Sequence, residues 1–283
     1  RKPMAETFEE RRQMYFDWLL EQETPDSRGG VWVDIGKLAA GADSISTTSF
    51  QATLDFVNER KDPSDFYMTA LVRLYYLFAG SGKLTPEQEA AIEEAMLNAK
   101  YWLDEPNTSY VEMWTENHQI LNHANEYLAG QLFPDEKFSN NGASGRWRME
   151  HARAKILEWI DLRARTGFAE WDSETYYPED LGALFNLADF AEDGEIANRA
   201  VMLIDLILFD IAVDSFYGQY ATSHGRVTPS SIQSAAGGSV TTLAALAWGQ
   251  GRFSSAGNMG VIGLATSPGY SVPPVIQSLA LDN

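Results

Sequence analysis

Glu116, Asn117 and His118 occupy three consecutive positions, shortly after Trp114. Together they supply a carboxylate, an amide and an imidazole, groups that accept, donate and transfer protons. The chain has only 4 histidines, and one of them stands here. A helix that needed only solubility or only a core would not use this combination. The stretch predicts a polar substrate site with three catalytic candidates, and Trp114 as a binding residue.

A second cluster, residues 167–177, is rich in acidic, hydroxyl and aromatic side chains. Sugars present an apolar face and a ring of hydroxyls, so a sugar site combines flat aromatic rings with hydrogen-bonding groups. This segment supplies both. Its candidate substrate-binding residues are Glu170, Trp171 and Tyr177. The alternative is a solvated acidic turn with Trp171 packed into the core.

A third cluster follows a long predicted helix and contains Tyr217, Tyr220, His224 and Arg226. It can supply a proton-transfer group and a fixed positive charge, with His224 as a binding candidate. Arg226 is notable because the chain is strongly acidic, and a local cation is needed to hold a substrate carboxylate. The alternative is a surface loop. If the three clusters meet at one rim, chance becomes a poor explanation for them.

Other motifs point away from metal and cofactor chemistry. His118 and His123 are five positions apart, which is off one helical face, and no zinc-ligand spacing is present. The glycine-rich stretches lack the lysine and strand context of a phosphate loop. No serine-centred nucleophile elbow occurs. The sequence therefore predicts neither a metal nor a cofactor.

Helix signals recur along most of the chain, whereas strand alternation is scarce. Residues 24–47 are expected to be a turn-rich segment. The spacing of a capping box occurs at Thr48 and Gln51, at Thr85 and Gln88, and at Ser109 and Glu112. The last of these would place His118 about two turns into a helix. The predicted helices cover residues 5–23, 48–60, 62–79, 85–103, 110–132, 146–165, 178–191, 193–213 and 240–248.

These elements predict an all-α fold made of serial helical hairpins. Hairpins in series need neighbouring hairpins to bury their apolar faces, and a closed or incomplete ring, an α/α toroid, meets that need. We expect the toroid to span residues 1–266, with a plain helical bundle as the alternative. Residues 267–283 are expected to be a linker or the start of a further domain, such as a β-domain that this chain lacks.

The chain has 283 residues and a formal net charge of −19, from 40 acidic and 21 basic residues. This field disfavours nucleic acid and anionic membranes as partners. No apolar run is long enough to span a bilayer. Cysteine is absent, which excludes disulfides and thiolate metal sites. These properties fit a secreted or periplasmic bacterial protein, and fit a cytosolic one nearly as well.

The serial hairpins, the Asn117-His118 pair and the later tyrosine and arginine resemble the α/α-toroid polysaccharide lyases. That group includes alginate and heparinoid lyases, which share a catalytic set of Asn, His, Tyr and Arg. The resemblance implies a polysaccharide or oligosaccharide substrate whose uronate carboxylate is neutralised by Asn117 with Arg226. It also implies that Tyr176, Tyr220 or His118 abstracts the C5 proton and protonates the leaving oxygen.

Glu116 stands where those families commonly have a further Asn, and it supports a second hypothesis. Glycoside hydrolases on similar toroids use two carboxylates, one of them a general acid with a raised pKa. Glu116 with Glu170 or Asp172 is a possible pair of this kind. A third hypothesis is a non-catalytic glycan-binding protein, which needs exposed aromatic rings but no clustered histidine and arginine.

Overall fold

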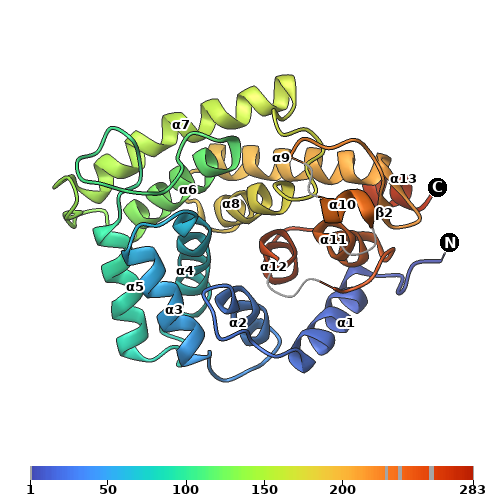
Figure 1. Ribbon diagram of the computed structural model, residues 1–283, viewed down its shortest axis with the longest axis horizontal. Coiled ribbons are helices and arrows are strands. Elements are labelled where there is room, and N and C mark those ends of the chain that lie inside the picture. The colour runs from blue at the N-terminus through green and yellow to red at the C-terminus, as the bar shows by residue number, and fades with distance from the viewer. Residues whose placement is uncertain (1, 227–228, 235–237, 255–257, 283) are drawn as a thin grey trace.

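Helices dominate the computed structural model, which describes residues 2–226, 229–234, 238–254 and 258–282 (Figure 1). A two-stranded antiparallel hairpin, β1 (Ser215–Phe216) and β2 (Gln219–Tyr220), is the sheet found there. The all-α class predicted from the sequence is confirmed. The helices are α1 (Phe8–Glu21), α2 (Gly30–Ala39), α3 (Thr47–Asn58), α4 (Ser64–Phe78), α5 (Pro86–Asn98), α6 (Glu116–Leu132), α7 (Gly145–Thr166), α8 (Tyr177–Phe190), α9 (Gly194–Val213), α10 (Pro229–Gln233), α11 (Ser239–Trp248), α12 (Met259–Thr266) and α13 (Pro274–Leu281).

Five helices form a closed circuit of neighbours. α2 contacts α4, α4 contacts α6, α6 contacts α8, α8 contacts α12, and α12 contacts α2 again. The remaining long helices lie outside this circuit: α1 packs on α2, α3 and α5 pack on α4, α7 packs on α6, and α9 packs on α8 (Figure 1). α4, α6 and α8 are therefore each packed on at least one helix outside the circuit, and α4 also contacts α8 directly.

A buried arginine connects three helices of the circuit. Arg73 on α4 is fully buried and donates to Asn186 (3.0 Å) and Asp189 (2.8 Å) on α8. It also donates to Thr266 on α12 at 2.8 Å. Because a buried guanidinium is tolerated only when its donors are satisfied, this clamp specifies how α4, α8 and α12 meet.

A capping-box sequence predicts the start of a helix correctly where no other residue caps the helix instead. Thr85 and Gln88 form the predicted capping box of α5. At α3, by contrast, the expected box at Thr48 and Gln51 is wrong, because Ser46 caps the helix by accepting from the backbone N–H of Ser49.

The segment expected to be turn-rich, residues 24–47, contains α2, so that prediction is wrong. Glycines made the helix hard to recognise, yet one of them is required by packing. A Cβ at Gly36 would lie 2.4 Å from Leu19 and 2.8 Å from Ile262. Tertiary burial of this helix outweighs its weak intrinsic propensity.

The start of α6 also differs from the prediction. Ser109 and Glu112 do not form a capping box; their side chains accept from the backbone N–H groups of Val111 and Trp114. The helix begins at Glu116, so the polar triplet lies in its first turn rather than two turns inside it. The first N–H groups of a helix have no intrahelical acceptor and carry partial positive charge, which is a suitable environment for an anion.

Residues 274–281, within the segment expected to be a linker, form α13. Ile276 and Ala280 are buried, and the helix packs against α9 and α11. Asn283, the last residue of that segment, lies outside the described residues. Across the described part of the chain, no helix has both the length and the apolar character needed to cross a membrane.

Candidate functional site

The carboxylate of Glu116 joins the start of α6 to the end of α7 and the loop after it. It accepts from Arg163 at 2.8 Å and from the backbone N–H groups of Ala169 (3.0 Å) and Glu170 (2.9 Å). Both partners of the ion pair are largely buried, with side-chain exposures of 3% for Glu116 and 9% for Arg163. A carboxylate satisfied in this way is held in place, which favours a structural role over the catalytic role expected from the sequence.

The loop held by Glu116 brings together four residues expected from the sequence: Asn117, Glu170, Arg226 and Tyr176. The amide of Asn117 donates to Glu170 at 3.3 Å, and Arg226 donates to the other oxygen of that carboxylate at 2.8 Å. Arg226 also donates to the hydroxyl of Tyr176 at 2.6 Å and lies 4.5 Å from its ring centre. The first, second and third sequence clusters therefore meet in one chain of contacts.

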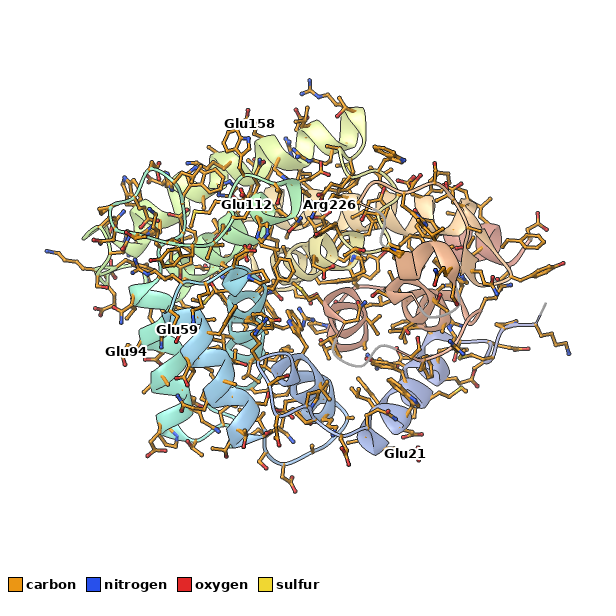
Figure 2. All side chains as sticks on the ribbon, viewed as in Figure 1. Glu21, Glu59, Glu94, Glu112, Glu158 and Arg226 are labelled. Carbon is orange, nitrogen blue, oxygen red and sulfur yellow. The ribbon has the colours of Figure 1, made fainter. Side chains whose placement is uncertain are left out.

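Backbone contacts join the loops of the second and third clusters. Gly225 donates to the carbonyl of Trp171 at 2.7 Å, and His224 contacts the carbonyl of Asp172 at 2.6 Å. Asp172 (φ 50°) and Arg226 (φ 60°) adopt the left-handed conformation. For such residues this conformation costs on the order of 1 kcal/mol, and it is found preferentially at functional sites. Arg226 is labelled in Figure 2 toward the middle of the molecule, away from Glu94 at its edge.

His118 is paired with a buried carboxylate on a different helix. Its Nδ1 lies 2.6 Å from Asp65 of α4, and Asn122 donates to the same carboxylate oxygen at 3.3 Å. Burial lowers the pKa of His118, but the hydrogen bond and charge of Asp65, together with Asp62 and Glu112, outweigh burial, so the pKa is raised. The arrangement is that of a general base oriented by a second group.

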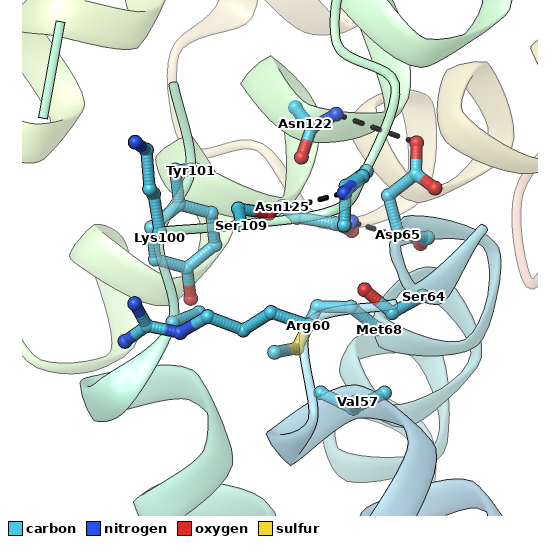
Figure 3. A pocket seen from close by; sticks show the side chains of 12 residues that line it. Val57, Arg60, Ser64, Asp65, Met68, Lys100, Tyr101, Ser109, Asn122 and Asn125 are labelled. Carbon is cyan, nitrogen blue, oxygen red and sulfur yellow. Dashed lines mark hydrogen bonds between the residues drawn. The ribbon is translucent and has the colours of Figure 1, made fainter. Parts of the chain in front are cut away.

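A small cavity of about 20 Å³ lies beside Asp65 (Figure 3). Asp65, Asn122 and Asn125 line it, and Asn125 donates to the backbone carbonyl of Asp65 at 3.2 Å. One oxygen of the Asp65 carboxylate is buried without a hydrogen-bond partner. Asn125 thus holds the backbone of Asp65, and Asn122 donates to the same carboxylate oxygen that contacts His118.

Two carboxyl groups that the sequence reasoning missed begin α8. Burial, followed by the charge of Glu170, raises the pKa of Glu179 to about 8. Burial and the charges of Glu116 and Glu170 raise the pKa of Asp180 well above its ordinary value. Each has an oxygen that is buried without a partner. Glu179 is therefore mostly protonated at pH 7. The position of both residues after Pro178 at a helix start was the available signal.

The remaining predicted residues divide into buried and exposed ones. Tyr177 and Tyr220 are each 2% exposed, and the hydroxyl of Tyr177 accepts from the backbone of Asp172 at 3.1 Å. Trp114 (68% exposed) and Trp171 (53% exposed) are open to solvent. The geometry therefore favours Tyr176 over Tyr220 as a proton-transfer group, and leaves the two tryptophans as surface binding candidates.

No group of three or more histidine or acidic side chains in the described part of the chain is placed to hold a metal ion. The site instead combines an oriented imidazole, a phenol bound to an arginine, an amide and two carboxyl groups with raised pKa values. These groups can move protons next to a bound anion. Comparison with known proteins found no matching family model, no matching curated protein and no matching solved structure.

Proposed function

We propose that this chain is a polysaccharide lyase that cleaves a uronate-containing glycan by β-elimination. One arrangement carries the proposal: a histidine oriented by a buried aspartate follows an amide that is linked through Glu170 to an arginine and a tyrosine. Elimination needs a base for the C5 proton, a group that neutralises the uronate carboxylate and an acid for the leaving oxygen. Each need has a candidate within this arrangement.

We also propose that the helices form an α/α toroid. The closed circuit of α2, α4, α6, α8 and α12, covered by outer helices, supports this architecture. In such a ring the inner helices present their ends to one face, where residues from distant segments can form a site. Asp65 on α4, His118 on α6 and Glu179 on α8 all lie within the first turn of their helices.

Neutralising the uronate carboxylate is the step that makes its C5 proton acidic enough to remove. Asn117 can donate an amide N–H, and Arg226 supplies a cation. Glu179 is protonated at neutral pH, so it can donate a hydrogen bond instead of repelling the substrate. The first turn of α6 adds the partial positive charge of a helix N-terminus. The local environment thus suits a carboxylate despite the net charge of the chain.

His118 is the proposed base. When its Nδ1–H donates to Asp65, the Nε2 nitrogen carries the free electron pair that removes the C5 proton. The raised pKa makes this nitrogen a stronger base than an isolated imidazole. The electrons of the C5–H bond form the C4=C5 double bond, and the bond between C4 and the leaving oxygen breaks.

Tyr176 is the proposed acid. Burial raises its pKa, so the hydroxyl is protonated at neutral pH and can give its proton to the leaving oxygen. The resulting phenolate is stabilised by Arg226, which already donates to the hydroxyl oxygen at 2.6 Å. The proton taken by His118 returns to Tyr176, through solvent or product, before the next cycle.

Glycoside hydrolysis is a second candidate, and the raised pKa of Glu179 is the observation that favours it. A protonated Glu179 near the carboxylate of Glu170, which is paired with Arg226, has the character of an acid and base pair. This pair differs from the one expected from the sequence, because Glu116 is occupied by Arg163 and two backbone amides.

Incubation with alginate, polygalacturonate, hyaluronan and gellan tests the proposal. A lyase produces new reducing ends together with the ultraviolet absorbance of an unsaturated uronide, in equal amounts. We expect both signals with at least one of these polymers. Reducing ends without the absorbance would favour hydrolysis through Glu179, and the absence of both signals would contradict either reaction.

Asp65→Asn is expected to lower kcat/KM roughly 10- to 100-fold and to move the acidic limb of its pH profile to lower pH. The base is active when unprotonated, so activity rises as pH rises through the pKa of His118. Asp65 raises that pKa, and its loss therefore shifts the limb downward. A pH profile measured from 5 to 9 checks this. An unmoved limb with the same loss of rate would mean that Asp65 acts on folding alone.

A further inference from the structure

Two adjacent tryptophan rings lie on the segment that leads into the site. The rings of Trp102 and Trp114 are 6.4 Å apart and inclined by 31°, and Trp114 is 68% exposed. Trp102 is partly buried and rests on the ring of His123 at 4.2 Å. Burial lowers the pKa of His123 to about 3, so this support is an uncharged ring at neutral pH. We call Trp102 and Trp114 the tryptophan platform.

The backbone of Trp114 is fixed although its side chain is open to water. Its N–H donates to the carboxylate of Glu112 at 2.7 Å, and its carbonyl accepts from Gln119 of α6 at 2.7 Å. Glu112 is itself anchored, because its N–H donates to Asp62 at 3.0 Å. A large ring exposed on a rigid backbone loses little conformational freedom when a ligand covers it, which is the condition for a preformed stacking surface.

The platform is continuous with the proposed site. Trp114 precedes Asn117 by three residues, and Asp62 lies 3.7 Å from the Nε2 nitrogen of His118. Asp62 and Glu112 also act electrostatically on His118. A glycan bound at His118 can therefore place its neighbouring sugar residues on the platform.

Two carboxylates lie along the backbone that holds the platform: Glu112 accepts from Trp114, and Asp62 accepts from Glu112. Glu112 is exposed, and the side chain of Asp62 is 48% exposed. Carboxylates accept hydrogen bonds from sugar hydroxyls, and the exposed Glu112 next to Trp114 repels a second carboxylate that would stack there. The rings and the carboxylates together suit the apolar face and hydroxyl groups of an uncharged pyranose, and they disfavour a uronate.

We propose that the tryptophan platform is a subsite for an uncharged sugar residue, and that the substrate is a heteroglycan containing both uronate and neutral sugars. The proposal rests on the proposed function, which places the uronate at His118 and Asn117. An uncharged-sugar subsite accounts for an acidic surface beside a site that binds an anion. The carboxylates there favour a neighbouring sugar that carries no charge.

Affinity electrophoresis in gels containing one polymer at a time tests the platform without requiring turnover. Gellan and hyaluronan contain uncharged sugars, whereas alginate and polygalacturonate consist of uronates. We expect wild-type protein to be retarded more by gellan or hyaluronan than by the two uronate polymers. Trp114→Ala should weaken that binding roughly three- to tenfold, and Trp114→Phe should restore most of it.

Phe209→Ala is the matched control, because it removes a ring that is 41% exposed on α9 and should leave binding unchanged. Stronger retardation by alginate or polygalacturonate, or equal retardation of wild type and Trp114→Ala, would overturn the platform. Elimination measured in parallel separates the two proposals. Binding that depends on Trp114 without elimination removes only the proposed function, and elimination unaffected by Trp114→Ala removes only the platform.

Discussion

His118→Ala is expected to abolish elimination while leaving the fold intact. His118 is the only group in the arrangement that is both basic near neutral pH and oriented by a buried partner, Asp65 at 2.6 Å. General bases of this kind contribute about 10²- to 10⁴-fold to rate, so kcat should fall by at least two orders of magnitude. The measurement is the initial rate of ultraviolet absorbance on the polymer that gives the largest signal with the wild-type protein.

Chemical rescue distinguishes lost proton transfer from lost structure. Free imidazole added to His118→Ala should restore part of the rate, with a pH dependence set by imidazole rather than by the Asp65 pair. Circular dichroism should show the wild-type helical content, because the His118 ring lies at the first turn of α6. A variant that keeps activity within tenfold of wild type would show that the base lies elsewhere.

Glu116→Ala is expected to lower the free energy of unfolding by about 3 kcal/mol, because it leaves the largely buried Arg163 without its partner. The backbone N–H groups of Ala169 and Glu170 lose their acceptor as well. The loop that carries Glu170 should then loosen, and activity should fall together with stability. Urea unfolding followed by circular dichroism gives the free energy, and the change should appear in the midpoint.

Glu158→Ala is the control for this experiment, since Glu158 is exposed on the same helix as Arg163. Its unfolding free energy should stay within about 0.5 kcal/mol of wild type. The opposite pattern for Glu116→Ala, wild-type stability with loss of the basic limb of the pH profile, would identify Glu116 as a catalytic acid. That result would support the hydrolase hypothesis from the sequence, in which Glu116 pairs with Glu170 or Asp172.

The helices with strong local signals were predictable, and those that depend on distant contacts were not. Thr85 and Gln88 start α5 as their spacing predicts. Ser109 and Glu112 have equally suitable spacing, but tertiary contacts replace the helix there: Tyr110 donates to the carbonyl of Arg60, and Glu112 donates to Asp62. A capping pattern is a local preference of about 1 kcal/mol, which a few tertiary hydrogen bonds can exceed.

The kinds of functional group at the site could be expected from composition, but the full set of residues that form it could not. Asn117, Tyr176 and Arg226 stand in conspicuous polar clusters, and the structure joins them through Glu170. Asp65 was missed because it lies 53 residues from His118 in sequence, within an ordinary helix start. Nothing in its neighbours along the chain distinguishes it from a solvated acid.

By itself, the sequence determined the helical class, the acidic charge and the three polar clusters, because periodicity and residue type are local properties. The role of each carboxyl group was decided only by the tertiary structure. Glu116 is bound by Arg163, whereas Glu179 is held neutral by burial. The same functional group becomes a structural anchor or a proton donor according to what surrounds it, and those surroundings come from segments far apart in the chain.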